Sequence, residues 1–343
     1  MNKNFKRNQG IFFKLITLVN IILMGIATGV LLGSFFRLSY LRYNKPTIRS
    51  PNKNKELLFK KENNEILKLT KSWESIYKDY QDLKLSAYVL FTSNNSFLKL
   101  NSRDILPAAS SLKVPILAIS LIEIQEGKFS LNDEIQLDKE SISSGAGWIS
   151  TKNIGTSFTV NELIKEMIKA NDNSAANLLI NKIGINYLNE KLKIIGLDST
   201  KFSKNFPDLQ GENISNSEDL VKLFQLIEME NLLSPKYKMM FYEILRLSSS
   251  NDFISEGLLR SLQKNIKSNN FEMELKKFGV EVFNRSGDIG ISYSDVGLIK
   301  MSDKTTAIAA FIVSGPFNDK RSPELIKKLS EVITRYQNLE NSY

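Results

Sequence analysis

Ser110 and Lys113 form a Ser-x-x-Lys pair in a chain whose composition leaves few other ways to build a nucleophilic site. The 343 residues include no His and no Cys. This absence excludes a Ser-His-Asp triad, a Cys nucleophile and the usual Cys/His zinc sites. A nucleophilic enzyme of this composition needs a Ser or Thr hydroxyl, with Lys, Asp, Glu or Tyr as the proton carrier.

The Ser110 copy of the pattern is set apart by its context. Four other copies begin at Ser50, Ser75, Ser96 and Ser261. Only Ser110 stands where a short loop turns into an apolar helix, so its hydroxyl lies near unpaired N–H groups and the positive end of the helix dipole. Positions i and i+3 share a helix face, so Lys113 can point back at that hydroxyl. A Lys buried near other cations can lose its proton and act as the base.

The elements that must position this pair are helices in the middle of the chain and strands towards both ends. Apolar spacing predicts helices at 66–80, 112–126, 160–170, 174–183, 220–229, 236–247 and 323–336. Strand patterns occur at 87–91, 280–283, 293–300 and 306–313. This order predicts one sheet built from both chain ends, enclosing a helical insertion.

The N-terminus carries a stretch without formal charge, Leu15 to Phe36, that is 22 residues long. At about 1.5 Å per residue it is long enough to span a bilayer core of roughly 30 Å. Basic residues before it favour a cytoplasmic N-terminus. A cleaved signal peptide is the alternative. The domains expected are a cytoplasmic stub (1–14), an uncleaved single-pass anchor in the plasma (inner) membrane (15–36), a polar linker (37–64) and an extracytoplasmic folded domain (65–343).

The net charge of +9 fits either scattered surface lysines or attraction to an anionic membrane surface or cell-wall polymer. The basic residues are not concentrated in one tract and form no recognisable nucleic-acid motif, so no nucleic-acid partner is expected. We expect a monomer that needs no metal ion and no organic cofactor.

Three segments of the chain contain motifs whose order along the sequence is informative. They read Ala109-Ser110-Ser111-Leu112-Lys113-Val114-Pro115, Asn171-Asp172-Asn173-Ser174-Ala175-Ala176-Asn177-Leu178-Leu179 and Arg285-Ser286-Gly287. Together they resemble the motifs of the class A β-lactamase and penicillin-binding serine-enzyme family, over roughly residues 65–340. The resemblance implies an α+β fold, with an antiparallel sheet flanked by helices and an all-α subdomain.

The resemblance also implies residue roles. Ser110 would attack a carbonyl and form an acyl-enzyme, while Lys113 accepts or relays its proton. The backbone N–H groups of Ser110 and Asp288 would form the oxyanion hole. Asn173 would hold the substrate amide and Lys113.

The third segment would bind the substrate carboxylate, with charge from Arg285 and a hydrogen bond from Ser286, next to Gly287. Arg in place of the family's Lys keeps the charge but changes the shape. Trp148 either walls the substrate cleft or is an ordinary core aromatic.

Two positions depart from the family pattern. Asn171 replaces a Ser that helps to pass a proton to the leaving nitrogen, and an amide cannot give up a proton at ordinary pH. Phe206 aligns with the Glu that activates the deacylating water in β-lactamases, although Asp208 and Glu212 stand nearby.

The loop around Phe206 is closer to that of the cyanobacterial β-lactamase-like penicillin-binding proteins. Three functions stay open: a D-Ala-D-Ala peptidase acting on peptidoglycan and acylated by β-lactams, a β-lactamase, and a non-catalytic binder of cell-wall peptide.

Overall fold

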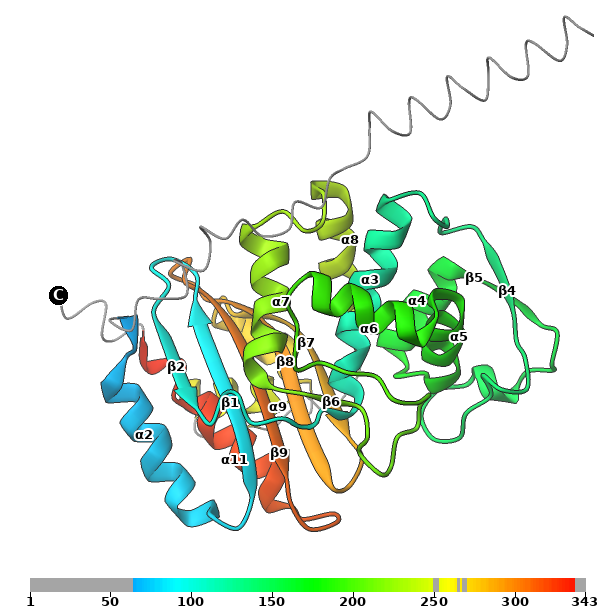
Figure 1. The fold of residues 1–343 in the computed structure, drawn as a ribbon. Helices are drawn as coiled ribbons and strands as arrows, with labels where there is room; N and C mark the ends of the chain where they lie inside the picture. The colour runs from blue at the N-terminus through cyan, green and yellow to red at the C-terminus, as the bar shows by residue number, and fades with distance from the viewer. Residues whose placement is uncertain (1–63, 249–252, 264–265, 267–269, 337–343) are drawn as a thin grey trace, which may run out of the picture. The chain divides into compact units, whose positions relative to one another are not determined.

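Strands from both ends of the chain form one antiparallel sheet with the order β2-β1-β9-β8-β7 (Figure 1). The strands are β1 (Lys84–Phe91), β2 (Phe97–Leu100), β7 (Glu281–Asp288), β8 (Ser292–Lys300) and β9 (Thr306–Ser314). The sheet confirms the predicted arrangement, in which the two chain ends enclose a helical insertion. It leaves β7 at one edge, and this strand carries Arg285, Ser286 and Gly287.

The computed structural model describes residues 64–248, 253–263, 266 and 270–336. The predicted stub and anchor, and the predicted linker except Asn64, lie outside the described residues. Within those ranges, no helix is both long enough and apolar enough to cross a bilayer.

The central strand β9 shows why the sheet has two covered faces. Its side chains alternate between two hydrophobic clusters, with Phe311 in one and Ile312 in the other. Such two-residue alternation places successive side chains on opposite faces of a sheet. One face is covered by α2 (Leu67–Tyr77), α9 (Phe253–Leu262), α10 (Phe271–Lys277) and α11 (Arg321–Glu331).

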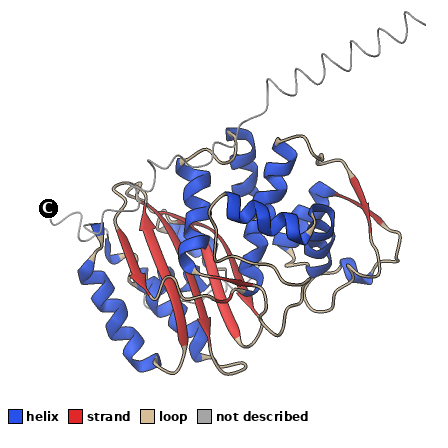
Figure 2. Ribbon diagram, in the orientation of Figure 1, coloured by secondary structure: helices blue, strands red, loops and turns tan. Residues whose placement is uncertain are grey.

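The last two of the enclosed helices cover the other face, and the earlier ones pack beside them (Figure 2). The enclosed helices are α3 (Lys113–Gln125), α4 (Val160–Lys169), α5 (Asn173–Ile183), α6 (Ile185–Ile194), α7 (Ser217–Met229) and α8 (Pro235–Leu245). Short strands pair beside them: β3 (Leu106–Pro107) with β6 (Ile214–Ser215), and β4 (Glu134–Gln136) with β5 (Ser157–Thr159).

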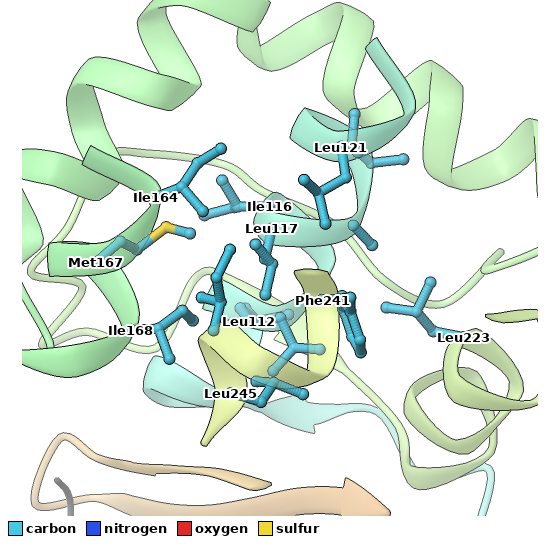
Figure 3. Close-up of a cluster of buried hydrophobic side chains, with 14 of the residues drawn as sticks. Leu112, Ile116, Leu117, Leu121, Ile164, Met167, Ile168, Leu223, Phe241 and Leu245 are labelled. Atoms are coloured by element: carbon cyan, nitrogen blue, oxygen red, sulfur yellow. The ribbon is translucent and has the colours of Figure 1, made fainter. Parts of the chain in front are cut away.

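Helix α3 is the centre of the helical part, and every residue from Lys113 to Ile124 is buried. Figure 3 shows Leu112, Ile116 and Leu117 among apolar side chains that come from α4, α7 and α8. A helix that is apolar on all sides is buried on all sides. The Lys113 side chain therefore begins inside the core, and Ser110 lies just before a helix that is held in place by packing on all sides.

The predicted strands and helices are all present, with shifted ends. The strand expected at 280–283 continues to Asp288, because the polar residues 284–288 pair with β8 rather than end the strand. Strands β2, β3, β4, β5 and β6 and helices α6, α9 and α10 were not predicted. These are short elements, and tertiary packing rather than a long apolar period decides their structure.

Candidate active site

Ser110 lies in a 3₁₀ turn, Ala109–Leu112, that leads directly into α3. The preceding Ala109 has a φ of +49°, a left-handed conformation that is uncommon for a residue other than Gly. Such strained residues persist where surrounding structure holds them, and they cluster at functional sites. The turn places Ser110 just before α3, three residues ahead of Lys113.

Hydrogen bonds to two carbonyls hold the strained turn. The Ala108 carbonyl accepts from the hydroxyls of Ser111 and Ser294, each at 2.6 Å. The Pro107 carbonyl accepts from the Ser292 hydroxyl, also at 2.6 Å. Since Ser292 and Ser294 belong to β8, the sheet fixes the chain that delivers the nucleophile.

Strand β7 approaches the nucleophile closely at Gly287. A Cβ on Gly287 would lie 2.4 Å from the Ser110 nitrogen, which no side chain can do without moving one of the two segments. The glycine therefore allows the edge strand to run against the Ser110 backbone. The next residue, Asp288, has its carboxylate engaged by the Gly290 N–H at 2.7 Å.

The Lys113 amine donates to oxygens of the second motif. Its Nζ lies 2.6 Å from both the backbone oxygen and the side-chain Oδ1 of Asn171, and 2.8 Å from Asn173 Oδ1. Three acceptors match the three hydrogens of an ammonium. A neutral amine has two hydrogens, so deprotonation releases one acceptor and creates a lone pair. Asn173 is fixed in turn by donating to the Ser144 carbonyl at 3.1 Å.

Burial lowers the pKa of the Lys113 amine well below its ordinary value, and the Arg285 charge lowers it further, against the opposing charge of Asp172. Arg285 is fully buried, and its Nη1 donates to the Ile168 carbonyl at 3.0 Å and to the Ser248 hydroxyl at 3.1 Å. The charge of Arg285 thus acts on the pKa of the base. Contact between Arg285 and a substrate carboxylate stays a prediction.

Phe206 lies against the same amine. The Lys113 Nζ is 5.2 Å from the centre of the Phe206 ring, a cation–π distance, and the ring is buried. Asn177 of α5 fixes the Phe206 backbone by accepting from its N–H and donating to its oxygen, both at 2.8 Å. An apolar ring thus occupies the side of Lys113 where the sequence alignment expects a carboxylate in β-lactamases.

The family assignment follows from comparison with known proteins. A model described as the beta-lactamase enzyme family matches residues 68–337, which include the whole site described above. The chain belongs to this β-lactamase family.

Three known proteins illustrate the range of this family. The D-alanyl-D-alanine endopeptidase of Haemophilus influenzae is 31% identical over 202 residues, covering 55% of this chain and 63% of the relative. The β-lactamase PSE-4 of Pseudomonas aeruginosa is 23% identical over 137 residues, covering 40% and 47%. The chain therefore spans less than two thirds of the length of these curated relatives.

The solved structure of PBP-A, a cyanobacterial penicillin-binding protein, is 26% identical with a TM-score of 0.72, covering 81% of this chain and 97% of that chain. A Leu-to-Glu variant of PBP-A, solved as its acyl-enzyme with penicillin G, has 26% identity and a TM-score of 0.71, covering 81% and 98%. The predicted family resemblance, including the penicillin-binding subgroup, is confirmed.

The carboxylates of Asp208 and Glu212, which stand close to Phe206 in the sequence, contact other residues. Glu212 pairs with Lys204 at 3.0 Å on the surface. Asp208 is buried, and its Oδ2 accepts from the Asn213 N–H at 2.6 Å. Among the described contacts, neither carboxylate touches Lys113 or Ser110.

Trp148 lies beside the second motif of the family. Its indole N–H donates to Glu166 at 2.7 Å, its ring packs edge-on against Phe158, and 40% of the residue is exposed. Its backbone N–H donates to Asp172, which also caps α5. Contact between Trp148 and a substrate stays a prediction.

The supporting residues were not singled out from the sequence. Ser294 and Ser292 had no local signal, because serine is abundant in the chain. Asp295 lies buried on β8 and accepts from the Ile254 N–H and the Asn284 amide, and burial raises its pKa to about 6. A charged residue within a predicted strand was the one available signal for Asp295.

Ser294→Ala is expected to slow acylation of Ser110 about fivefold, because one hydrogen bond that holds the strained turn is worth about 1 kcal/mol. Stopped-flow measurement with a chromogenic β-lactam would show the loss in the acylation rate constant, with little change in the binding constant. Ser120→Ala is the matched control, since the Ser120 hydroxyl is buried without a partner and its removal should leave the rate unchanged. Equal rates in all three proteins would show that Ser294 does not position the nucleophile.

The acylation rate constant is expected to rise as the pH is raised past the lowered pKa of Lys113, because only the neutral amine can take the Ser110 proton. Arg285→Gln removes a positive charge, so the pKa of Lys113 rises and the acidic limb moves to higher pH. Arg285→Lys keeps the charge and should leave the limb near its original position. The acylation rate constant measured against pH checks this. An unmoved limb in the Gln variant would remove Arg285 from the control of Lys113.

Proposed function

We propose that the protein is a serine hydrolase that forms an acyl-enzyme on Ser110 with D-Ala-D-Ala peptides of peptidoglycan and with β-lactams. In this proposal it releases β-lactam products slowly, as a penicillin-binding DD-peptidase rather than a resistance enzyme. The observation that carries the distinction is the buried Phe206 ring, 5.2 Å from the Lys113 amine. The PBP-A acyl-enzyme with penicillin G and the endopeptidase relative support the same class.

In this proposal acylation uses Ser110, Lys113 and two backbone N–H groups. The Ser110 oxygen attacks the substrate carbonyl, and its proton passes to the neutral Lys113 amine. The developing oxyanion is stabilised by the N–H groups of Ser110 and Asp288, and each such donor contributes roughly 3 kcal/mol. The carbon–nitrogen bond then breaks, and the leaving nitrogen takes the proton from Lys113.

Lys113 must deliver that proton directly or through water, because Asn171 has no hydroxyl to relay it. Asn171 instead accepts from Lys113 through its side-chain and backbone oxygens. The Asn171 Nδ2 group remains a hydrogen-bond donor only. We infer that Asn171 holds the base, and that proton delivery limits the rate of acylation.

Peptidase and β-lactamase activity can be separated on the full chain in detergent. Release of D-alanine from a diacetyl-Lys-D-Ala-D-Ala peptide, lost in Ser110→Ala, is the expected result. Hydrolysis of a chromogenic cephalosporin at many turnovers per second would instead support the β-lactamase alternative, which the PSE-4 match favours. A chain that binds the peptide but releases no D-alanine would be a non-catalytic binder, and the proposal would be wrong.

Asn171→Ser is expected to speed acylation about tenfold or more, because a hydroxyl can relay the proton to the leaving nitrogen. Asn171→Ala is the matched control, since it also removes the Oδ1 acceptor of Lys113 but supplies no hydroxyl. The acylation rate constants of the three proteins are compared at one pH. An unchanged or slower rate in the Ser variant would show that Asn171 is not the limiting departure.

We further propose that residues 15–36 anchor the protein in the inner membrane, with the catalytic domain on the extracytoplasmic side, where peptidoglycan lies. The charge-free length of this stretch and the basic residues before it support the proposal. Digestion of the catalytic domain by protease added to intact spheroplasts is the expected result. Protection until the membrane is lysed would contradict it.

A further inference from the structure

A cavity of about 860 Å³ lies away from Ser110, between the outer strands of the sheet and α7. We call it the α7 groove. Its walls include Tyr88 of β1, Phe97 of β2 and Met229 at the end of α7, together with the loop residue Asp198. None of the residues given a role at the nucleophile lines it, so the catalytic site does not explain it.

The α7 groove combines an apolar surface with charged groups of both signs. The rings of Tyr88 and Phe97 pack against each other with centres 5.8 Å apart. Met229 is 42% exposed and adds a large apolar side chain to this surface. The charged groups that line the groove are four acidic and three basic: Asp198, Glu218, Asp219 and Glu230, with Lys99, Arg103 and Lys222.

The described chain begins on the rim of this groove. Asn64 is one of its lining residues and donates through its side chain to the Asn94 carbonyl at 3.0 Å. The next residue, Glu65, bridges to Phe97 of β2. Whatever precedes Asn64 in the sequence therefore starts at the α7 groove.

The residues before Asn64 include an apolar run followed by basic side chains. Leu57-Leu58-Phe59 is an apolar run between Glu56 and Lys60-Lys61, and residues 50–63 contain four Lys and two Glu. Five residue steps separate Phe59 from Asn64, which at roughly 3.5 Å per residue gives a reach of about 18 Å. The run can thus reach the groove without any rearrangement of the described domain.

We propose that residues 56–61 dock in the α7 groove, with Leu57-Leu58-Phe59 against its apolar surface and Lys60-Lys61 towards its acidic groups. Burial of the run contributes roughly 25 cal/mol per Å² of apolar surface, and the tether raises its effective concentration to the millimolar range. The docking itself does not depend on the catalytic proposal.

Because the chain has no Cys, an engineered pair gives a single possible intramolecular disulfide. In the full chain in detergent, the Phe59→Cys/Met229→Cys pair tests docking in the groove. The Phe59→Cys/Leu67→Cys pair is the control, because Leu67 is 61% exposed on α2 and lies only eight residues along the chain. A free tether favours this short closure.

Under mild oxidation, the 59/229 pair is expected to form its disulfide at least tenfold faster than the 59/67 pair, measured by mass spectrometry of non-reduced peptides. Lys60→Glu/Lys61→Glu should slow the 59/229 reaction severalfold and leave the 59/67 reaction unchanged or faster. Equal or inverted rates for the two pairs would overturn the proposal. Disulfide-linked dimers as the main product would also overturn it, since they would make a second copy the occupant.

Discussion

Lys113→Met should lower the acylation rate of Ser110 by roughly 10²–10⁴-fold, the usual contribution of a positioned general base. Methionine keeps the length and volume of the side chain in the core but cannot accept the Ser110 proton. The chain offers no His as a substitute base. Stopped-flow acylation by a chromogenic β-lactam measures the loss.

Lys191→Met is the matched control for this variant. Lys191 is also a buried lysine, but it pairs with Glu123 at 3.1 Å, away from the nucleophile. Its loss should lower the melting temperature, because it leaves the buried Glu123 carboxylate with Lys128 as its remaining cation, and should not change the acylation rate. An acylation rate within tenfold of wild type for Lys113→Met would contradict the assignment of Lys113 as the base.

Phe206→Glu should speed hydrolysis of the acyl-enzyme by roughly 10²–10⁴-fold. The variant places a carboxylate on the side of the base where the ring now excludes one, within reach of a water that attacks the ester. Asn177 would still hold the backbone of residue 206 on both sides. The rate at which the penicillin adduct disappears, followed by intact mass, measures the change.

The same variant has a second, opposite effect on acylation. A carboxylate facing Lys113 favours the ammonium, so the pKa of Lys113 rises and acylation slows at neutral pH. Phe206→Gln separates the two effects, because it is polar and similar in size to Glu but cannot accept a proton from water. If Glu and Gln accelerate adduct loss equally, added solvent access rather than a general base explains the change.

The sequence could predict the candidate catalytic residues because their types are constrained. Without His, the base had to be Lys, Asp, Glu or Tyr, and the second and third motifs singled out Ser110, with Lys113, from the other Ser-x-x-Lys copies. The structure joins Lys113 to Asn171 and Asn173 across about sixty residues of chain. It also places Phe206 against Lys113, in agreement with the alignment of the loop.

The sequence could not show the contacts that depend on how elements pack. The hydrogen bond from Ser294 to the Ala108 carbonyl joins residues 186 positions apart, and nothing local marks either one. The complete burial of Arg285 follows from the packing of β7 against the end of α4, whereas the motif suggested a side chain directed at substrate. We therefore assign Arg285 a role that the motif did not predict, which is to lower the pKa of Lys113.

The fate of penicillin G on the full-length protein tests the central claim most directly. We predict one covalent adduct per chain, located on the peptide that contains Ser110, absent in Ser110→Ala and still present hours after free penicillin is removed. Rapid hydrolysis of penicillin without an accumulated adduct would contradict the role given to Phe206. Neither adduct nor hydrolysis would contradict the assignment of Ser110 as a nucleophile.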